Sequence, residues 1–199
     1  IYLDSNKSSH HNTELLVSAI SFITAFSDRD RKITIHLCLL PDKKLLRKNS
    51  KKLTNLNANS GSNRFSSTES EICIFRNEEC IKVMFHEIIH GLHCSNLGSH
   101  SAITERLCQK YNLDSKTILM NESYTEMWAK IMNCLFISTM ASSNNYQQFC
   151  TMISIESDFS CHQFHKVRKL IYDGARGIDD NTNCTAYYLV VAEIFQKLP

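Results

Sequence analysis

Two histidines and a glutamate form the most informative pattern in the sequence, the HExxH segment at residues 86–90. Because four residues complete about one helical turn, His86 and His90 would lie on the same face of a helix. Two imidazoles in that arrangement can share one Zn²⁺, and Glu87 can then take a proton from water at the open metal position. The pattern also occurs by chance, so the rest of the chain has to supply a third ligand.

The residues directly after His90 do not supply that ligand. The longer zinc motif HExxHxxGxxH requires glycine at position 93 and histidine at position 96, where this chain has His93 and Asn96. On a continuous helix His93 would project about 60° away from the ligand face. We therefore interpret His93 as a residue that lines or caps the site.

A pair of glutamates on a second predicted helix offers the missing ligand. Residues 117–140 have a helical pattern in which Glu122 and Glu126 lie one turn apart and face the same way. One carboxylate can bind the metal, and the other can accept the ring N–H of a ligand histidine and so fix its tautomer. Two carboxylates on an otherwise apolar helix are costly without a cationic partner, and zinc with two histidines would provide one.

With these two helices the chain resembles the gluzincin branch of the zincin metallopeptidases. In that family an HExxH helix is followed by an NExxxE-like or NExxxD-like motif, matched here by residues 86–90 and 121–126. The resemblance implies three zinc ligands: His86, His90 and Glu122. It also implies that Glu87 is the general base and that Glu126 is the outer partner of a ligand histidine.

The resemblance implies a fold as well, a zincin-like α+β fold with a small sheet packed on a mostly helical body that carries the HExxH helix. An edge strand precedes the motif helix and pairs with an extended substrate, and residues 72–75 suit that role. In gluzincins a Tyr or His beyond the ligand glutamate often stabilises the oxyanion. Six residues are candidates, with Tyr187 or Tyr188 favoured and a core role as the alternative for that pair: Tyr172, Tyr187, Tyr188, His162, His165 and Arg168.

The order of the predicted elements independently indicates the α+β class. Strands are predicted at 32–40 and 71–76, and helices at 13–26, 77–93, 117–140, 146–155, 161–173 and 183–197. Residues 42–70 are polar and rich in Lys, Asn and Ser, and we predict a loop insertion with at most one short helix. The length of 199 residues predicts one domain that spans residues 1–199.

Composition restricts the compartment and the partners. A hydrophobic content of 43% with 21% charged residues is typical of a globular protein, and a net charge of +2 is too small for a general polyanion binder. No apolar stretch has the length of a membrane span. The nine cysteines include no CxxC pair and mostly occupy apolar patterns, which favours reduced thiols and an intracellular location. Cys161, His162 and His165 lack a companion pair, so we expect no second zinc site there.

A looser resemblance covers more of the chain. Residues 76–79, the two helices and residues 183–188 are similar to uncharacterised metallopeptidase-like proteins of large eukaryotic DNA viruses, which implies a viral protein of the cytoplasm or the virion. We predict a zinc-dependent peptidase for peptide or protein substrates, including acidic peptides that the basic stretch 43–52 would attract. The alternative is a catalytically silent zincin-fold protein with a structural or virion-associated interaction role. Nucleic-acid binding through residues 43–52 is the least favoured function, because no base-reading motif accompanies them.

Overall fold

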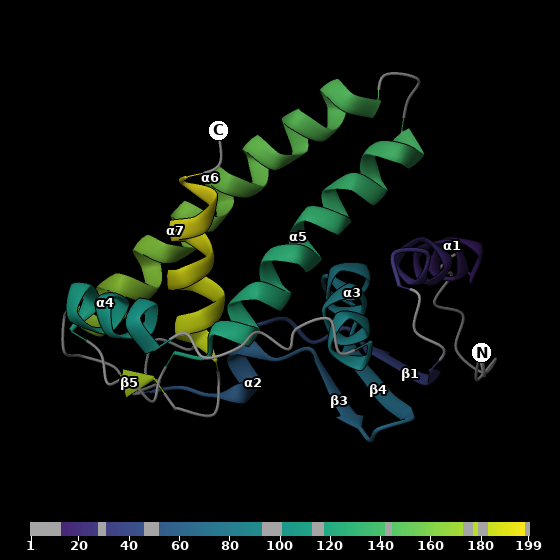
Figure 1. The fold of residues 1–199 in the computed structure, drawn as a ribbon, viewed down its shortest axis with the longest axis horizontal. Helices are drawn as coiled ribbons and strands as arrows, with labels where there is room; N and C mark the ends of the chain where they lie inside the picture. The colour runs from purple at the N-terminus through teal and green to yellow at the C-terminus, as the bar shows by residue number, and fades with distance from the viewer. Residues whose placement is uncertain are drawn as a thin grey trace.

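The computed structural model describes residues 13–27, 31–45, 52–92, 101–112, 118–141, 145–172, 177–178 and 183–197. In these residues helices predominate over small sheets, which confirms the α+β class (Figure 1). The strands are β1 (Lys32–Leu40), β2 (Lys52–Leu53), β3 (Gly61–Phe65), β4 (Glu69–Arg76) and β5 (Gly177–Ile178). The helices are α1 (Thr13–Thr24), α2 (Asn55–Ala58), α3 (Cys80–Gly91), α4 (Ser101–Tyr111), α5 (Met120–Ala141), α6 (Asn145–Tyr172), the π-helix η3 (Thr185–Val190) and α7 (Val191–Phe195).

The larger sheet has the strand order β1-β4-β3, with β1 parallel and β3 antiparallel to β4. Every second side chain of β4 is buried, as expected for a strand with one face on the core: Ser70, Ile72, Ile74 and Arg76. The turn of the β3–β4 hairpin is closed by the N–H of Ser66, which donates to the carbonyl of Glu69 (2.8 Å). Because β3 lies at one end of the strand order, it is an edge strand, and it packs beside α3.

Two sequence predictions about this region are wrong. Residues 42–70 are not one loop, because β2, α2 and β3 lie within them. Residues 72–75 are not an edge strand, because β4 pairs with β1 on one side and with β3 on the other. The Gly-Ser-Asn-Arg-Phe sequence of β3 has a low strand propensity, so pairing with β4 rather than local preference holds it extended.

Helix α3 is buried on nearly all sides, and this burial fixes the direction of its histidine face. Residues 83–89 are all buried. The ring of Phe85 lies 6.0 Å from that of Phe22 in α1 and 5.8 Å from that of Phe136 in α5. Removal of this apolar surface from water stabilises the packing of α3 between the sheet, α1 and α5.

Helices α5 and α6 run side by side in opposite directions, and η3 and α7 pack against them (Figure 1). Lys130 of α5 ties the pair together, because its Nζ donates to the Glu156 carboxylate and to Ser160 Oγ of α6. The sequence predicted two helices here, with a break across residues 156–160, but α6 is continuous. The side chains of Glu156 and Ser160, which lie inside the predicted break, are satisfied by Lys130.

The remaining predicted elements agree with the structure within a few residues. The segments at 13–26, 32–40, 71–76, 77–93 and 117–140 correspond to α1, β1, β4, α3 and α5. Helix α4 was not predicted, and residues 183–197 contain a π-helix before α7. None of the described helices is long and apolar enough to cross a membrane.

Candidate metal centre

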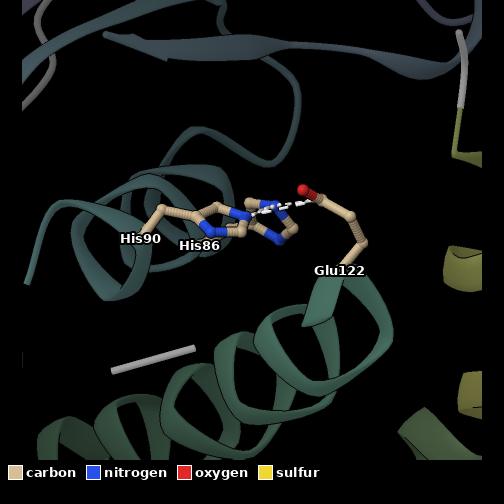
Figure 2. Close-up of side chains that lie close together, drawn as sticks. All are labelled: His86, His90 and Glu122. Carbon is tan, nitrogen blue, oxygen red and sulfur yellow. Dashed lines mark hydrogen bonds and ion pairs between the residues drawn. The ribbon is translucent and has the colours of Figure 1, made fainter. Parts of the chain in front are cut away.

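Three side chains from α3 and α5 bring their ligand atoms to one point (Figure 2). The Nε2 atoms of His86 and His90 are 3.2 Å apart. Oε2 of Glu122 lies 3.5 Å from the first nitrogen and 3.4 Å from the second. Within the described part of the chain, no other three His, Cys, Asp or Glu side chains converge in this way. The three residues assigned as ligands from the sequence therefore lie together.

The spacing of these atoms fits a zinc ion. Zinc bonds to histidine nitrogen and carboxylate oxygen measure about 2.0–2.2 Å, and tetrahedral geometry then puts neighbouring ligand atoms about 3.3–3.5 Å apart. The distances of 3.2, 3.4 and 3.5 Å agree with that expectation. Three protein ligands also leave one tetrahedral position open, as in catalytic zinc sites.

Glu126 contacts the far side of the His86 ring. Its Oε2 lies 2.9 Å from His86 Nδ1, and both side chains are buried. The carboxylate accepts the Nδ1–H of the ring, which leaves Nε2 directed toward His90 and Glu122. One helical turn separates the two glutamates, so one carboxylate reaches the ligand point and the other reaches the outer ring nitrogen.

His86 and Glu122 each shift the pKa of the other. Burial opposes the positive charge on His86, but hydrogen bonds with Glu122 and Glu126 raise its pKa from 6.5 to about 9. Burial also opposes the charge on Glu122, yet His86 and His90 hold its pKa well below the usual range. The proton on His86 thus balances an ionised carboxylate, and a divalent cation can replace that proton.

Glu87 projects from α3 toward the edge strand β3. A Cβ added at Gly61 would lie only 2.9 Å from Glu87 Oε1. Asn63 Nδ2 donates to the backbone carbonyl of Glu87 (2.8 Å), which fastens β3 to the helix. Burial raises the pKa of the Glu87 carboxyl, while His86 and His90 oppose that rise. A buried carboxyl with a raised pKa beside the ligand point is suited to proton transfer.

Tyr187 of η3 lies at the site and not in the apolar core. Its hydroxyl donates to Glu122 Oε2 (3.0 Å), and its ring centroid lies 5.5 Å from that of His86. Asn183 Nδ2 lies 3.5 Å from the same hydroxyl. Burial, followed by the charge of Glu122, raises the pKa of Tyr187, so the phenol remains a proton donor. π-helical turns are frequent at functional sites, and this one directs Tyr187 to the ligand point.

A cavity of about 540 Å³ contains all of these side chains. Its walls come from α3, α5, α6, η3 and residues 57–65, and Tyr188 is also part of the lining. This volume lies within the range of about 300–1,000 Å³ that is usual for binding sites. His90 and Glu122, which line this cavity, are 13% and 16% exposed.

Several sequence candidates do not belong to this cavity. His162, His165 and Arg168 are exposed on α6, and Cys161 accepts a hydrogen bond from Gln196 (3.4 Å). These α6 side chains form no metal-ligand group among the described residues. Other sequence candidates fall outside the described residues or side chains: His93, Asn96, Tyr172, Arg47, Lys48, Lys51 and Lys52.

The sequence reasoning missed three residues that the structure places at the site. Gly61 and Asn63 were assigned to a loop, and no local signal connects them to Glu87. Lys82 donates to Glu126 Oε1 (2.8 Å), and its position one turn before His86 on the same helix could have identified it.

Comparison of the chain with models of known protein families, with curated proteins and with solved structures found no match. The geometry of the site therefore carries the functional assignment.

Proposed function

We propose that the protein is a zinc-dependent peptidase of the gluzincin type. The observation that carries this proposal is the convergence of three ligand atoms at tetrahedral zinc spacing: His86 Nε2, His90 Nε2 and Glu122 Oε2. When bound there, zinc lowers the pKa of its water to about 7 and polarises the peptide carbonyl. The edge strand beside the motif helix supports a zincin-like fold.

Glu87 is the general base in this proposal. It lines the cavity next to the ligand histidines, and its carboxylate makes no hydrogen bond to the other described residues. It can therefore accept the proton of the attacking water and pass it to the leaving amine. The raised pKa of the Glu87 carboxyl brings its proton affinity closer to the value needed both to accept the proton from water and to pass it to the amine.

Tyr187 is the proposed donor to the carbonyl oxygen that gains negative charge. Its hydroxyl lies at Glu122 Oε2, one of the ligand atoms, and it stays protonated in this environment. Such a donor stabilises the charge that develops in the transition state more than it stabilises the bound substrate.

The edge strand β3 offers a surface for an extended peptide. The N–H of Phe75 donates to the carbonyl of Ser60 (3.0 Å), which sets the alternation of the antiparallel pair. The backbone groups of Gly61 and Asn63 then point away from β4, at the rim of the cavity. A peptide that adds to this edge would pass Glu87 with its main chain held by hydrogen bonds.

The test compares zinc content and peptide cleavage in the wild type and Glu87→Gln. We expect Glu87→Gln to keep its zinc and to lose about 10²- to 10⁴-fold in cleavage rate, the usual contribution of a general base. Glu71→Gln is the control, because Glu71 is exposed on the outer face of the sheet and pairs with His36. Cleavage that survives in Glu87→Gln would refute the role of Glu87.

A wild type that binds zinc but cleaves no peptide would instead favour a catalytically silent zincin-fold protein. Glu87 argues against that alternative, because a structural zinc site needs no carboxylate beside an open position and is usually closed by four ligands.

A further inference from the structure

Lys82 is a partly buried lysine one helical turn before His86 on α3. Its Nζ donates to Glu126 Oε1 (2.8 Å), and the other carboxylate oxygen of Glu126 lies 2.9 Å from His86 Nδ1. The side chains of Lys82 and Glu126 are only 16% and 9% exposed. Each oxygen of the Glu126 carboxylate thus has one partner. Oε1 contacts Lys82, and Oε2 contacts His86, a candidate zinc ligand.

Lys82 also forms a second ion pair, with Glu79. Glu79 Oε2 lies 3.7 Å from Lys82 Nζ and 3.0 Å from the Nζ of Lys44. Burial opposes the charge on Lys82, but Glu126 and then Glu79 hold its pKa above the usual range. Lys82 is therefore a permanent cation whose direction is fixed by two carboxylates.

We propose that Lys82 is a positioning residue of the metal centre, because it holds Glu126 against His86 and so fixes His86 Nε2 toward the ligand point. The inference rests on the zinc site of the proposed function but not on its peptidase activity. Without Lys82, one oxygen of a buried carboxylate would lose its donor, and the side chain would no longer have a fixed orientation. Loss of such an outer partner typically weakens metal binding about 10- to 100-fold.

Lys130 provides a matched comparison within the same cavity. Its side chain is 10% exposed, and its Nζ is paired with Glu156 and Ser160 of α6. Lys82 and Lys130 thus share burial, a carboxylate partner and a place in the cavity lining. Only Lys82 donates to the carboxylate that contacts His86.

The experiment measures zinc affinity by competition with a chelating dye in the full chain. We expect Lys82→Met to bind zinc about 10- to 100-fold more weakly than the wild type, and Lys82→Arg, which keeps charge and donors, to stay within about threefold. Lys130→Met should lower stability but also keep zinc affinity within about threefold. In the Glu126→Gln background, Lys82→Met should cause no further loss, because its effect passes through Glu126.

Circular dichroism and thermal unfolding of each metal-free variant show that it is folded. If Lys82→Met does not fold, Lys82→Gln, whose side chain is one atom shorter and carries no charge, takes its place with the same expected direction. Wild-type affinity in either variant would overturn the proposal, and so would a full additional loss in the Glu126→Gln background. A wild type that binds no zinc overturns this proposal and the peptidase together. A wild type that binds zinc without cleaving peptides overturns only the peptidase.

Discussion

Replacement of Gly61 by alanine should displace Glu87 while leaving the metal ligands in place. The added Cβ would lie 2.9 Å from Glu87 Oε1, 3.1 Å from Glu87 Cγ and 2.8 Å from Val83 Cγ1. Comfortable contacts between such atoms require about 3.5–4.0 Å, so the neighbours must move by several tenths of an ångström to about 1 Å. Val83 is packed in the core. The Glu87 carboxylate is the end of a flexible side chain in a cavity, so it moves most.

The expected size of the effect follows from that displacement. A shift of about 1 Å in a catalytic group can lower the rate about 10²-fold. We therefore expect Gly61→Ala to reduce kcat about 100-fold and to destabilise the fold by about 1–3 kcal/mol through overpacking. Zinc affinity should change less than about threefold, since the clashes involve Glu87 and Val83 and not the ligand atoms.

The assay combines steady-state peptide cleavage with zinc competition on the same preparation. Arg64→Ala is the control on the same strand, because Arg64 is exposed and is not among the residues that line the cavity. We expect the control to keep wild-type kcat. An unchanged kcat in Gly61→Ala would refute the position or the role of Glu87. Parallel loss of zinc and activity would instead show damage to the metal site.

Two further predictions concern Tyr187 and pH. Tyr187→Phe removes the hydroxyl that faces Glu122 and should lower kcat about 10²- to 10³-fold while zinc affinity is retained. An unchanged kcat would assign oxyanion stabilisation to another donor. Zinc affinity should rise about tenfold per pH unit up to about pH 9, because zinc must displace the Nε2 proton of His86, whose pKa the hydrogen bonds with Glu122 and Glu126 raise. Without metal, the same proton stabilises the fold fully below pH 6.5, and this stability is lost as the pH rises through about 9. Calorimetric zinc titration and thermal unfolding with a chelator measure the two trends, and pH-independent results would contradict this assignment for His86.

The convergence of His86, His90 and Glu122 could be predicted because these residues follow helical spacing. His86 and His90 on one helix and Glu122 and Glu126 on another need only the turn length of an α-helix to be placed. The apolar residues around them, such as Phe85, also indicate the buried side of each helix. Packing of α3 against α5 then brings the two faces together.

The arrangement of β3 beside the site could not be predicted because it depends on long-range strand pairing. β3 forms only when its polar residues align with β4, and this alignment places Gly61 and Asn63 beside Glu87. Lys130 of α5 likewise bonds to Glu156 and Ser160 of α6, a contact between helices that the local sequence of α6 does not reveal. The π-helix at Thr185–Val190 pairs i with i+5, so the α-helical spacing used for residues 183–197 did not describe the turn that carries Tyr187.

The zinc content and zinc affinity of the wild type and Glu122→Ala test the central claim most directly. Glu122 Oε2 is one of the three converging ligand atoms, whereas Glu105 on α4 is exposed and serves as the control site. We predict one zinc per chain in the wild type and in Glu105→Ala. In Glu122→Ala the affinity should fall more than about 100-fold, beyond the effect of an outer partner. Zinc retained at full affinity in Glu122→Ala would contradict the metal centre described here.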